Sequence, residues 1–181
     1  MPRLPQRIVC LSTETVEVLY LLGEEGRIAG ISGFTTHPPW ARKEKPKVSG
    51  FSSAKIERIL AVEPDLVLAF SDLQGEIARD LVKAGVAVHV FNHRSVDGIL
   101  AMIETVGRLV GAEARAVALV AELEAIIADV RAAGEARAAR LGRRPRVYFE
   151  EWNDPLITGI RWVSELIGIA GGEDCFGELS V

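Results

Sequence analysis

The stretch that decides the fold is residues 52–70, which read SSAKIERILAVEPDLVLAF. The two serines at its start are N-cap candidates, and the apolar residues of 54–62 fall on one helix face, so we expect a helix there. Pro64 ends the helix, and the apolar run 65–70 predicts a buried strand. A helix followed at once by such a strand is typical of a parallel α/β sheet.

The same alternation continues on both sides of this stretch. Strands are expected over 7–11, 27–32 and 86–91, and helices over 14–22 and 74–84. Residues 33–47 contain Pro38, Pro39 and Pro46, and predict a long ordered loop. Four strands within about ninety residues predict one α/β lobe, with a parallel sheet and helices on both faces.

The pattern changes after Ser95. Helices are expected over 96–110 and 113–141, and the second spans roughly 40 Å at 1.5 Å per residue, more than one small lobe needs. Its apolar stripe lacks sustained heptads, so a connecting helix is favoured over a coiled coil.

A second α/β pattern then begins, with strands expected over 146–150 and 156–158 and a helix over 161–170. We therefore expect an N-terminal lobe over 1–94, a helical connector over 95–144 and a partial second lobe over 145–181, incomplete as written.

Composition excludes several classes of function for this chain. The 181 residues carry a net charge of −4, so no basic excess favours nucleic acid as a partner. No apolar stretch is long enough to span a bilayer, and the N-terminus lacks the apolar region of an export signal. Cys10 and Cys175 show no zinc-type spacing, and Cys10 fits a small core residue.

Common catalytic motifs are missing from the sequence. The first strand–helix junction, 11–15, contains no glycine, which excludes a dinucleotide fingerprint, and neither a P-loop nor a GxSxG elbow occurs. His89 and His93 flank a strand end, where their spacing does not bring side chains together, so ordinary polar roles are favoured over metal ligation. His37 lies in the proline-rich loop and is a candidate cofactor-metal contact, with a solvated loop histidine as the favoured alternative.

Aromatic and hydroxyl side chains follow the expected strands. Ligands of open α/β sheets bind beyond the carboxyl ends of the strands, and such side chains suit a large, partly apolar ligand. Trp152 and Trp162 bracket a turn in the second pattern, and Glu150 with Glu151 is the single acidic pair that an enzyme could use there. With no catalytic pairing visible, a binding protein is favoured over an enzyme, with no intrinsic cofactor.

Four motifs resemble those of the cobalamin- and ferric-siderophore-binding proteins of ABC importers. They are RIVCLS at 7–12, the loop ending HPP at 37–39, KIERI through EPDLV at 55–67, and FEEWNDPLITGIRW at 149–162, the last similar to the cobalamin-binding branch in particular. The resemblance implies two lobes joined by one long helix, with the ligand clamped between them.

The resemblance also implies residue roles. Phe34, Phe51 and Phe70 match aromatic residues of the corrinoid pocket, Ser71 matches another pocket position, and Glu57 matches an acidic residue that pairs with permease arginines. The full set of expected ligand contacts is Ser12, Thr13, Phe34, His37, Phe51, Ser52, Phe70, Ser71, Glu151, Trp152, Arg161 and Trp162. No catalytic or metal-binding residue is assigned.

Alternatives remain open at this point. A ferric siderophore or haem is the second ligand class. Siderophores are often anionic and would need arginines in the site. Because Arg161 is the one obvious arginine among the expected contacts, a less charged corrinoid is favoured. The family is exported, whereas the missing signal fits a cytoplasmic corrinoid-handling protein or enzyme. The incomplete second lobe also predicts dimerisation through its open sheet edge.

Overall fold

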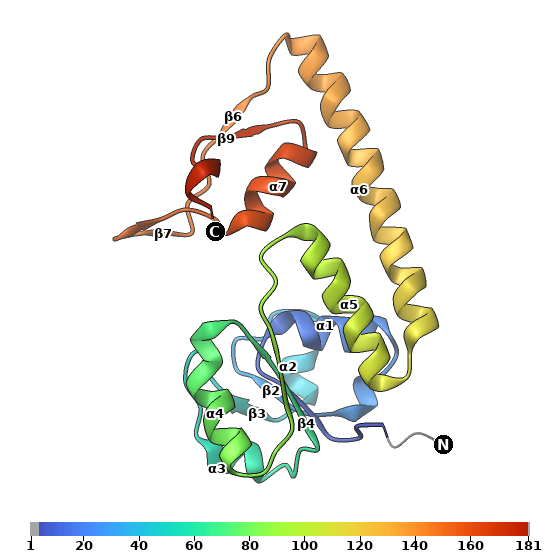
Figure 1. Ribbon diagram of the computed structural model, residues 1–181, viewed down its shortest axis with the longest axis vertical. Helices are drawn as coiled ribbons and strands as arrows, with labels where there is room; N and C mark the ends of the chain where they lie inside the picture. Colours follow the sequence, from blue (N-terminus) through green and yellow to red (C-terminus); the bar gives the residue numbers. More distant parts are fainter. Residues whose placement is uncertain (1–3, 181) are drawn as a thin grey trace. The chain divides into compact units, whose positions relative to one another are not determined.

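The computed structural model describes residues 4–180, which form two compact units (Figure 1). Unit 1 combines the residues up to Asn92 with residues 102–116, and unit 2 combines residues 93–101 with those from 117 onward. The three-part domain division expected from the sequence stays a prediction.

Unit 1 is built on a five-stranded parallel sheet with the strand order β3-β2-β1-β4-β5. The strands are β1 (Ile8–Cys10), β2 (Ile28–Ser32), β3 (Lys47–Ser49), β4 (Leu66–Phe70) and β5 (Val88–Phe91). Every residue of β1 and β4 is buried, because helices cover both faces of a central parallel strand. The parallel-sheet lobe predicted from the sequence is confirmed.

Short helices cover this sheet. They are α1 (Thr13–Leu21), α2 (Ala41–Glu44), α3 (Ile56–Leu60) and α4 (Gly75–Lys83), with 3₁₀ turns η1 (Glu25–Arg27) and η2 (Asp72–Gln74). The connection from β3 to β4 reverses the direction in which the strands are added, so right-handed crossovers place α3 and α4 on the face opposite α1. Figure 1 shows α3 and α4 side by side, and their apolar residues share one core cluster with the sheet.

The expectation of a long loop over 33–47 was wrong at its end. The segment contains α2 and runs into β3, an edge strand whose central residue Val48 is 4% exposed. Because Lys47 and Ser49 flank this single apolar side chain, the strand has no periodic signature in the sequence.

The two long helices match the sequence prediction. They are α5 (Val96–Val110) and the 29-residue α6 (Glu113–Leu141). Gly111 separates them with φ +72°, a left-handed conformation that glycine adopts at helix ends. Among the residues described, no helix combines the length and the apolar character needed to cross a membrane.

Unit 2 contains two very short sheets and one further helix. Its elements are β6 (Arg146–Val147), β7 (Trp152–Asn153), β8 (Leu156–Ile157), α7 (Arg161–Ile169), β9 (Glu173–Asp174) and η3 (Gly177–Leu179). β6 pairs with β9 in parallel, and β7 pairs with β8 as a hairpin. Neither β7 nor β9 was expected, and the first strand of the unit is shorter than predicted, because two-residue strands carry too few side chains to show alternation.

Two backbone segments of unit 2 pass very close to each other. A Cβ atom added to Gly134 of α6 lies 2.7 Å from the carbonyl carbon of Ala170, and one added to Gly171 lies 2.4 Å from the carbonyl oxygen of Gly134. Glycine is therefore required on both sides of the contact between α6 and the end of α7.

Candidate ligand-binding site

The expected ligand contacts of unit 1 gather at one edge of its sheet. Ser12 follows β1, Phe34 follows β2, Phe51 follows β3, and Phe70 ends β4. Because these strands are parallel, their carboxyl ends meet at the same edge, where α/β proteins bind ligands. The structure thus groups these residues, while their role in binding stays a prediction.

Phe34 is held at this edge with its ring in solvent. Phe34 is 69% exposed, although both its backbone N–H and its carbonyl oxygen form hydrogen bonds. The Ser32 hydroxyl accepts a hydrogen bond from Phe34 N at 3.2 Å, and the Thr13 hydroxyl donates to Phe34 O at 3.4 Å. Thr36 N in turn donates to the Thr13 hydroxyl at 3.4 Å. The backbone of Phe34 is therefore fixed by hydrogen bonds while its ring stays accessible for contact.

Gln74 organises the edge and was missed by the sequence analysis. Its fully buried carboxamide donates to Leu11 O at 3.1 Å and to Phe51 O at 2.8 Å, and it accepts from Phe70 N at 2.9 Å. One side chain therefore fixes the ends of β1 and β4 and the segment after β3. The sequence shows only a polar residue at a helix start, and nothing local reveals these partners.

Phe70 and Ser71 are packed more tightly than ligand-facing residues usually are. They are 7% and 1% exposed, and Ser71 has φ +60°, an uncommon conformation for a non-glycine residue. Its hydroxyl accepts from Leu73 N at 3.3 Å and caps η2. Ser12 is also buried, whereas Ser52 is exposed and Phe51 is half-buried.

His37 is exposed in the loop after β2, and its Nδ1 lies 3.2 Å from the Thr36 hydroxyl. Within residues 4–180 no group of three or more His, Cys, Asp or Glu side chains could hold a metal ion. His89 packs on Phe91 with a centroid distance of 4.3 Å, and burial lowers the pKa of His89.

In unit 2, the β7–β8 hairpin presents Trp152. Glu151 N donates to Ile157 O at 2.9 Å, and the Trp152 indole N–H donates to Asp154 O at 2.9 Å across the turn. Trp152 is 59% exposed, and Glu151 is exposed as well. The hairpin therefore displays an aromatic face beside a carboxylate.

The other expected contacts of unit 2 lie on the first turn of α7. Arg161 forms an ion pair with Glu165 at 2.8 Å. Trp162 stacks against His93 with a centroid distance of 5.7 Å, and it lines an apolar pocket of about 530 Å³ together with Phe149.

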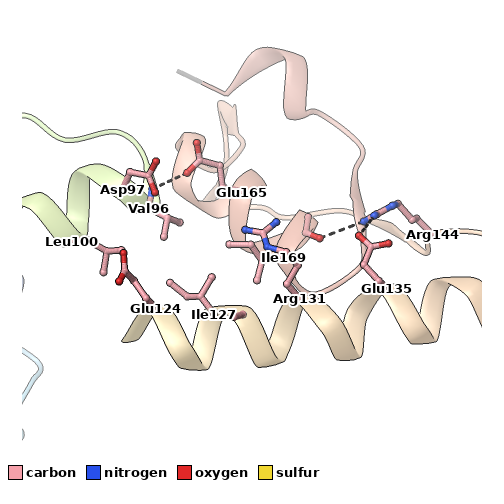
Figure 2. Close-up of a pocket in the computed structure, with 12 residues that line it drawn as sticks. Val96, Asp97, Leu100, Glu124, Ile127, Arg131, Glu135, Arg144, Glu165 and Ile169 are labelled. Atoms are coloured by element: carbon pink, nitrogen blue, oxygen red, sulfur yellow. Dashed lines mark hydrogen bonds and ion pairs between the residues drawn. The ribbon is translucent and has the colours of Figure 1, made fainter. Parts of the chain in front are cut away.

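A larger pocket of about 620 Å³ lies between α6, α7 and the start of α5, and Figure 2 shows its charged lining. Arg144 pairs with Glu135 and donates to Gly168 O at 3.3 Å. Glu165 accepts from Val96 N at 2.7 Å (Figure 2). These contacts tie three helices together inside unit 2, so this pocket is best explained as a structural junction.

Comparison with known proteins places the chain in a family. It is 30% identical over 179 residues to the cobalamin-binding protein of Halobacterium salinarum, covering 97% of this chain and 47% of that protein. It is 31% identical over 185 residues to the vitamin B12-binding protein of Vibrio campbellii, covering 96% and 62%. Among solved structures, the apo form of a periplasmic haem-binding protein from Roseiflexus sp. RS-1 superposes with a TM-score of 0.82 at 25% identity, covering 97% of this chain and 68% of that one.

The chain thus spans about half to two thirds of the length of these relatives. The family model described as periplasmic binding protein matches residues 8–180, nearly all of the chain. This match agrees with the predicted binding protein. The chain belongs to the periplasmic binding protein family.

Proposed function

We propose that this chain is part of the substrate-binding component of an ABC importer and that it binds cobalamin or a related corrinoid. Two relatives with about 30% identity are named for cobalamin or vitamin B12. The observation that carries the proposal is the group of aromatic and hydroxyl residues at the carboxyl edge of the sheet, with the Phe34 ring in solvent on a hydrogen-bonded backbone.

In this proposal the aromatic rings make apolar contact with the corrin macrocycle. Phe34 and Phe51 of unit 1 supply two such rings, and the exposed Trp152 of unit 2 is a separate candidate contact. The exposed hydroxyl of Ser52 accepts a hydrogen bond from an amide group on the rim of a corrinoid. The protein holds its cargo without chemical change and needs no intrinsic cofactor.

Haem or a ferric siderophore is the second candidate, since the Roseiflexus relative is named for haem. Anionic chelates need cationic side chains in the site, and the guanidinium of Arg161 is already paired with Glu165. The uncharged amide rim of a corrinoid fits these side chains better.

The proposed partner is an ABC permease, reached from outside the cytoplasm. Glu57 is exposed on α3 and can meet an arginine of such a partner. We expect Glu57→Lys to abolish co-purification with the permease and to leave ligand affinity unchanged. Glu17→Lys, at an exposed position of α1, is the matched control and should keep the complex. Equal loss with both variants would argue against a specific contact at Glu57.

The test of ligand binding is a titration with cyanocobalamin, followed by tryptophan quenching and corrinoid absorbance. Two proteins are compared: the 181-residue chain, and a chimaera in which the remainder of the Halobacterium salinarum relative follows residue 181. Haem is titrated in parallel. Saturable cyanocobalamin binding by either protein supports the proposal, whereas haem binding without corrinoid binding supports the second candidate.

Phe34→Ala in the binding-competent protein should weaken cyanocobalamin binding roughly tenfold, because one stacked aromatic ring is removed. Leu21→Ala is the control, since this side chain is 59% exposed on α1, away from the carboxyl edge. An unchanged dissociation constant in Phe34→Ala would remove Phe34 from the site.

A further inference from the structure

A basic pocket lies on unit 1, at the edge strand of its sheet. It has a volume of about 490 Å³ and is lined by residues of β3, the segment after it and α3. The lining residues are Lys47, Val48, Ser49, Gly50, Ser53, Ala54, Lys55 and Arg58. Three of them are cationic, two carry hydroxyl groups and none is acidic, so the pocket has a net positive charge.

Several polar groups of this pocket lack partners. The Ser49 hydroxyl oxygen is buried and makes no hydrogen bond within the part of the chain that the structure describes. In the same described part, the side chains of Lys55 and Arg58 form no hydrogen bond or ion pair. Lys47 donates one hydrogen bond, to Arg42 O at 2.7 Å, and has two ammonium hydrogens left. A buried hydroxyl without a partner costs free energy, and the unpaired cationic groups beside it are open to a ligand.

We propose that this pocket binds a phosphate group. A phosphate dianion offers several acceptor oxygens, which matches two or three cationic donors and two hydroxyl donors around one cavity. The planar guanidinium of Arg58 can donate two parallel hydrogen bonds to it, while Lys47 and Lys55 act as point charges. The inference is independent of the proposed corrinoid function, because it concerns a different set of residues.

Protection of the sheet edge explains only part of this arrangement. A lysine on an edge strand discourages pairing with a second sheet, and Lys47 satisfies that need. Lys55 and Arg58 lie outside the strand, however, and the Ser49 hydroxyl remains without a partner under this explanation.

The experiment is a titration of the ¹⁵N-labelled 181-residue chain with inorganic phosphate at constant ionic strength. The amide signals of Gly50 and Ser53 report on the pocket. We expect saturable shifts at these two residues and at least roughly tenfold weaker binding in the double variant Lys55→Gln/Arg58→Gln, because two charge-assisted hydrogen bonds are lost. Arg42→Gln/Lys43→Gln removes the same charge from the exposed α2 helix and should bind as the wild type does.

A second arm identifies the source of the phosphate group. Vesicles of phosphatidylglycerol are sedimented with the chain, and phosphatidylcholine vesicles serve as the control. Co-sedimentation that is lost in Lys55→Gln/Arg58→Gln alone indicates a lipid headgroup, whereas saturable binding of inorganic phosphate without co-sedimentation indicates a free phosphate. Ser49→Ala, which keeps every charge, should weaken either interaction several-fold. Linear shifts without co-sedimentation, or equal binding by both double variants, overturn the proposal.

Discussion

One side chain at the edge of the sheet, that of Gln74, joins three segments that lie far apart in the sequence. The Gln74 carboxamide satisfies Leu11 O, Phe51 O and Phe70 N, three main-chain groups from three segments. The bonds to Leu11 O and Phe70 N are buried and the bond to Phe51 O is partly buried, so removing the amide costs free energy at each of them.

Gln74→Ala should therefore lower the free energy of unfolding by about 3 kcal/mol, roughly 1 kcal/mol for each lost hydrogen bond. Urea unfolding followed by circular dichroism measures this change. Gln6→Ala is the control, because its exposed amide makes one hydrogen bond, to Leu4 O, and should cost less than about 0.5 kcal/mol. A similar small cost for both variants would show that the three bonds of Gln74 contribute little.

Cys10 gives the protein a specific dependence on alkaline pH. Its thiol is fully buried in β1, and desolvation raises its pKa from 9.0 to about 12, against smaller opposing effects of Thr15 and Lys45. The unfolded chain loses this proton first, so ionisation favours unfolding. The stabilisation is complete below pH 9 and is lost between pH 9 and 12.

The difference in unfolding free energy between the wild type and Cys10→Ala tests this. It should stay constant from pH 7 to 8, and above pH 9 the wild type should lose up to about 1.4 kcal/mol per pH unit relative to the variant. Parallel curves up to pH 11 would contradict the assigned pKa.

At the scale of elements, the main chains of α6 and of the end of α7 approach each other too closely for a Cβ atom between them. Gly134→Ala places a methyl group 2.7 Å from main-chain atoms, which cannot rotate away, so the helix must shift. We expect a loss of about 2–3 kcal/mol in stability, as for other overpacked sites.

Gly168→Ala is the matched control for this prediction. It lies within α7 and has no atom within 4 Å of the added Cβ, so better helix propensity should stabilise the protein by up to about 1 kcal/mol. Thermal unfolding followed by tryptophan fluorescence should give opposite shifts for the two variants. Shifts of the same sign would mean that the close contact opens in solution.

How far an element can be predicted from the sequence depends on its length and on the period of its apolar residues. The limits of α6 were predicted to the residue, because a stretch rich in Ala, Glu and Arg runs between clear breaks. β3 was missed because Val48 alone is buried in it, and β7 and β9 are too short to show a period.

The candidate site divides in the same way. The family resemblance proposes Phe34 and Trp152 as ligand contacts, and both roles stay predictions; the structure shows that both side chains are exposed. The role of Gln74 depends on which distant segments meet in space, and the pairing of Arg161 with Glu165 depends on side-chain rotamers. Residue type alone predicts neither.

At the scale of the whole molecule, unit 2 leaves large apolar side chains in solvent. Trp152, Leu156, Ile157, Leu166 and Leu179 are all at least 46% exposed. Such a surface favours association, and the two-stranded sheet of β6 and β9 has open edges for pairing.

The chain should therefore dimerise as its concentration rises, measured by sedimentation equilibrium. Leu166→Lys should shift the equilibrium toward the monomer, whereas Leu21→Lys, an exposed leucine of unit 1, should not. A monomer at all accessible concentrations would exclude this association.

The hydrogen bonds of Gln74 have one more consequence for the diversity of the family. The amide binds only main-chain atoms, so it is indifferent to the side chains at Leu11, Phe51 and Phe70. The frame of the edge and the side chains proposed to contact a ligand are therefore separable in engineering. A library that varies Phe51 and Ser52 while keeping Gln74 should retain the fold and still sample new ligands.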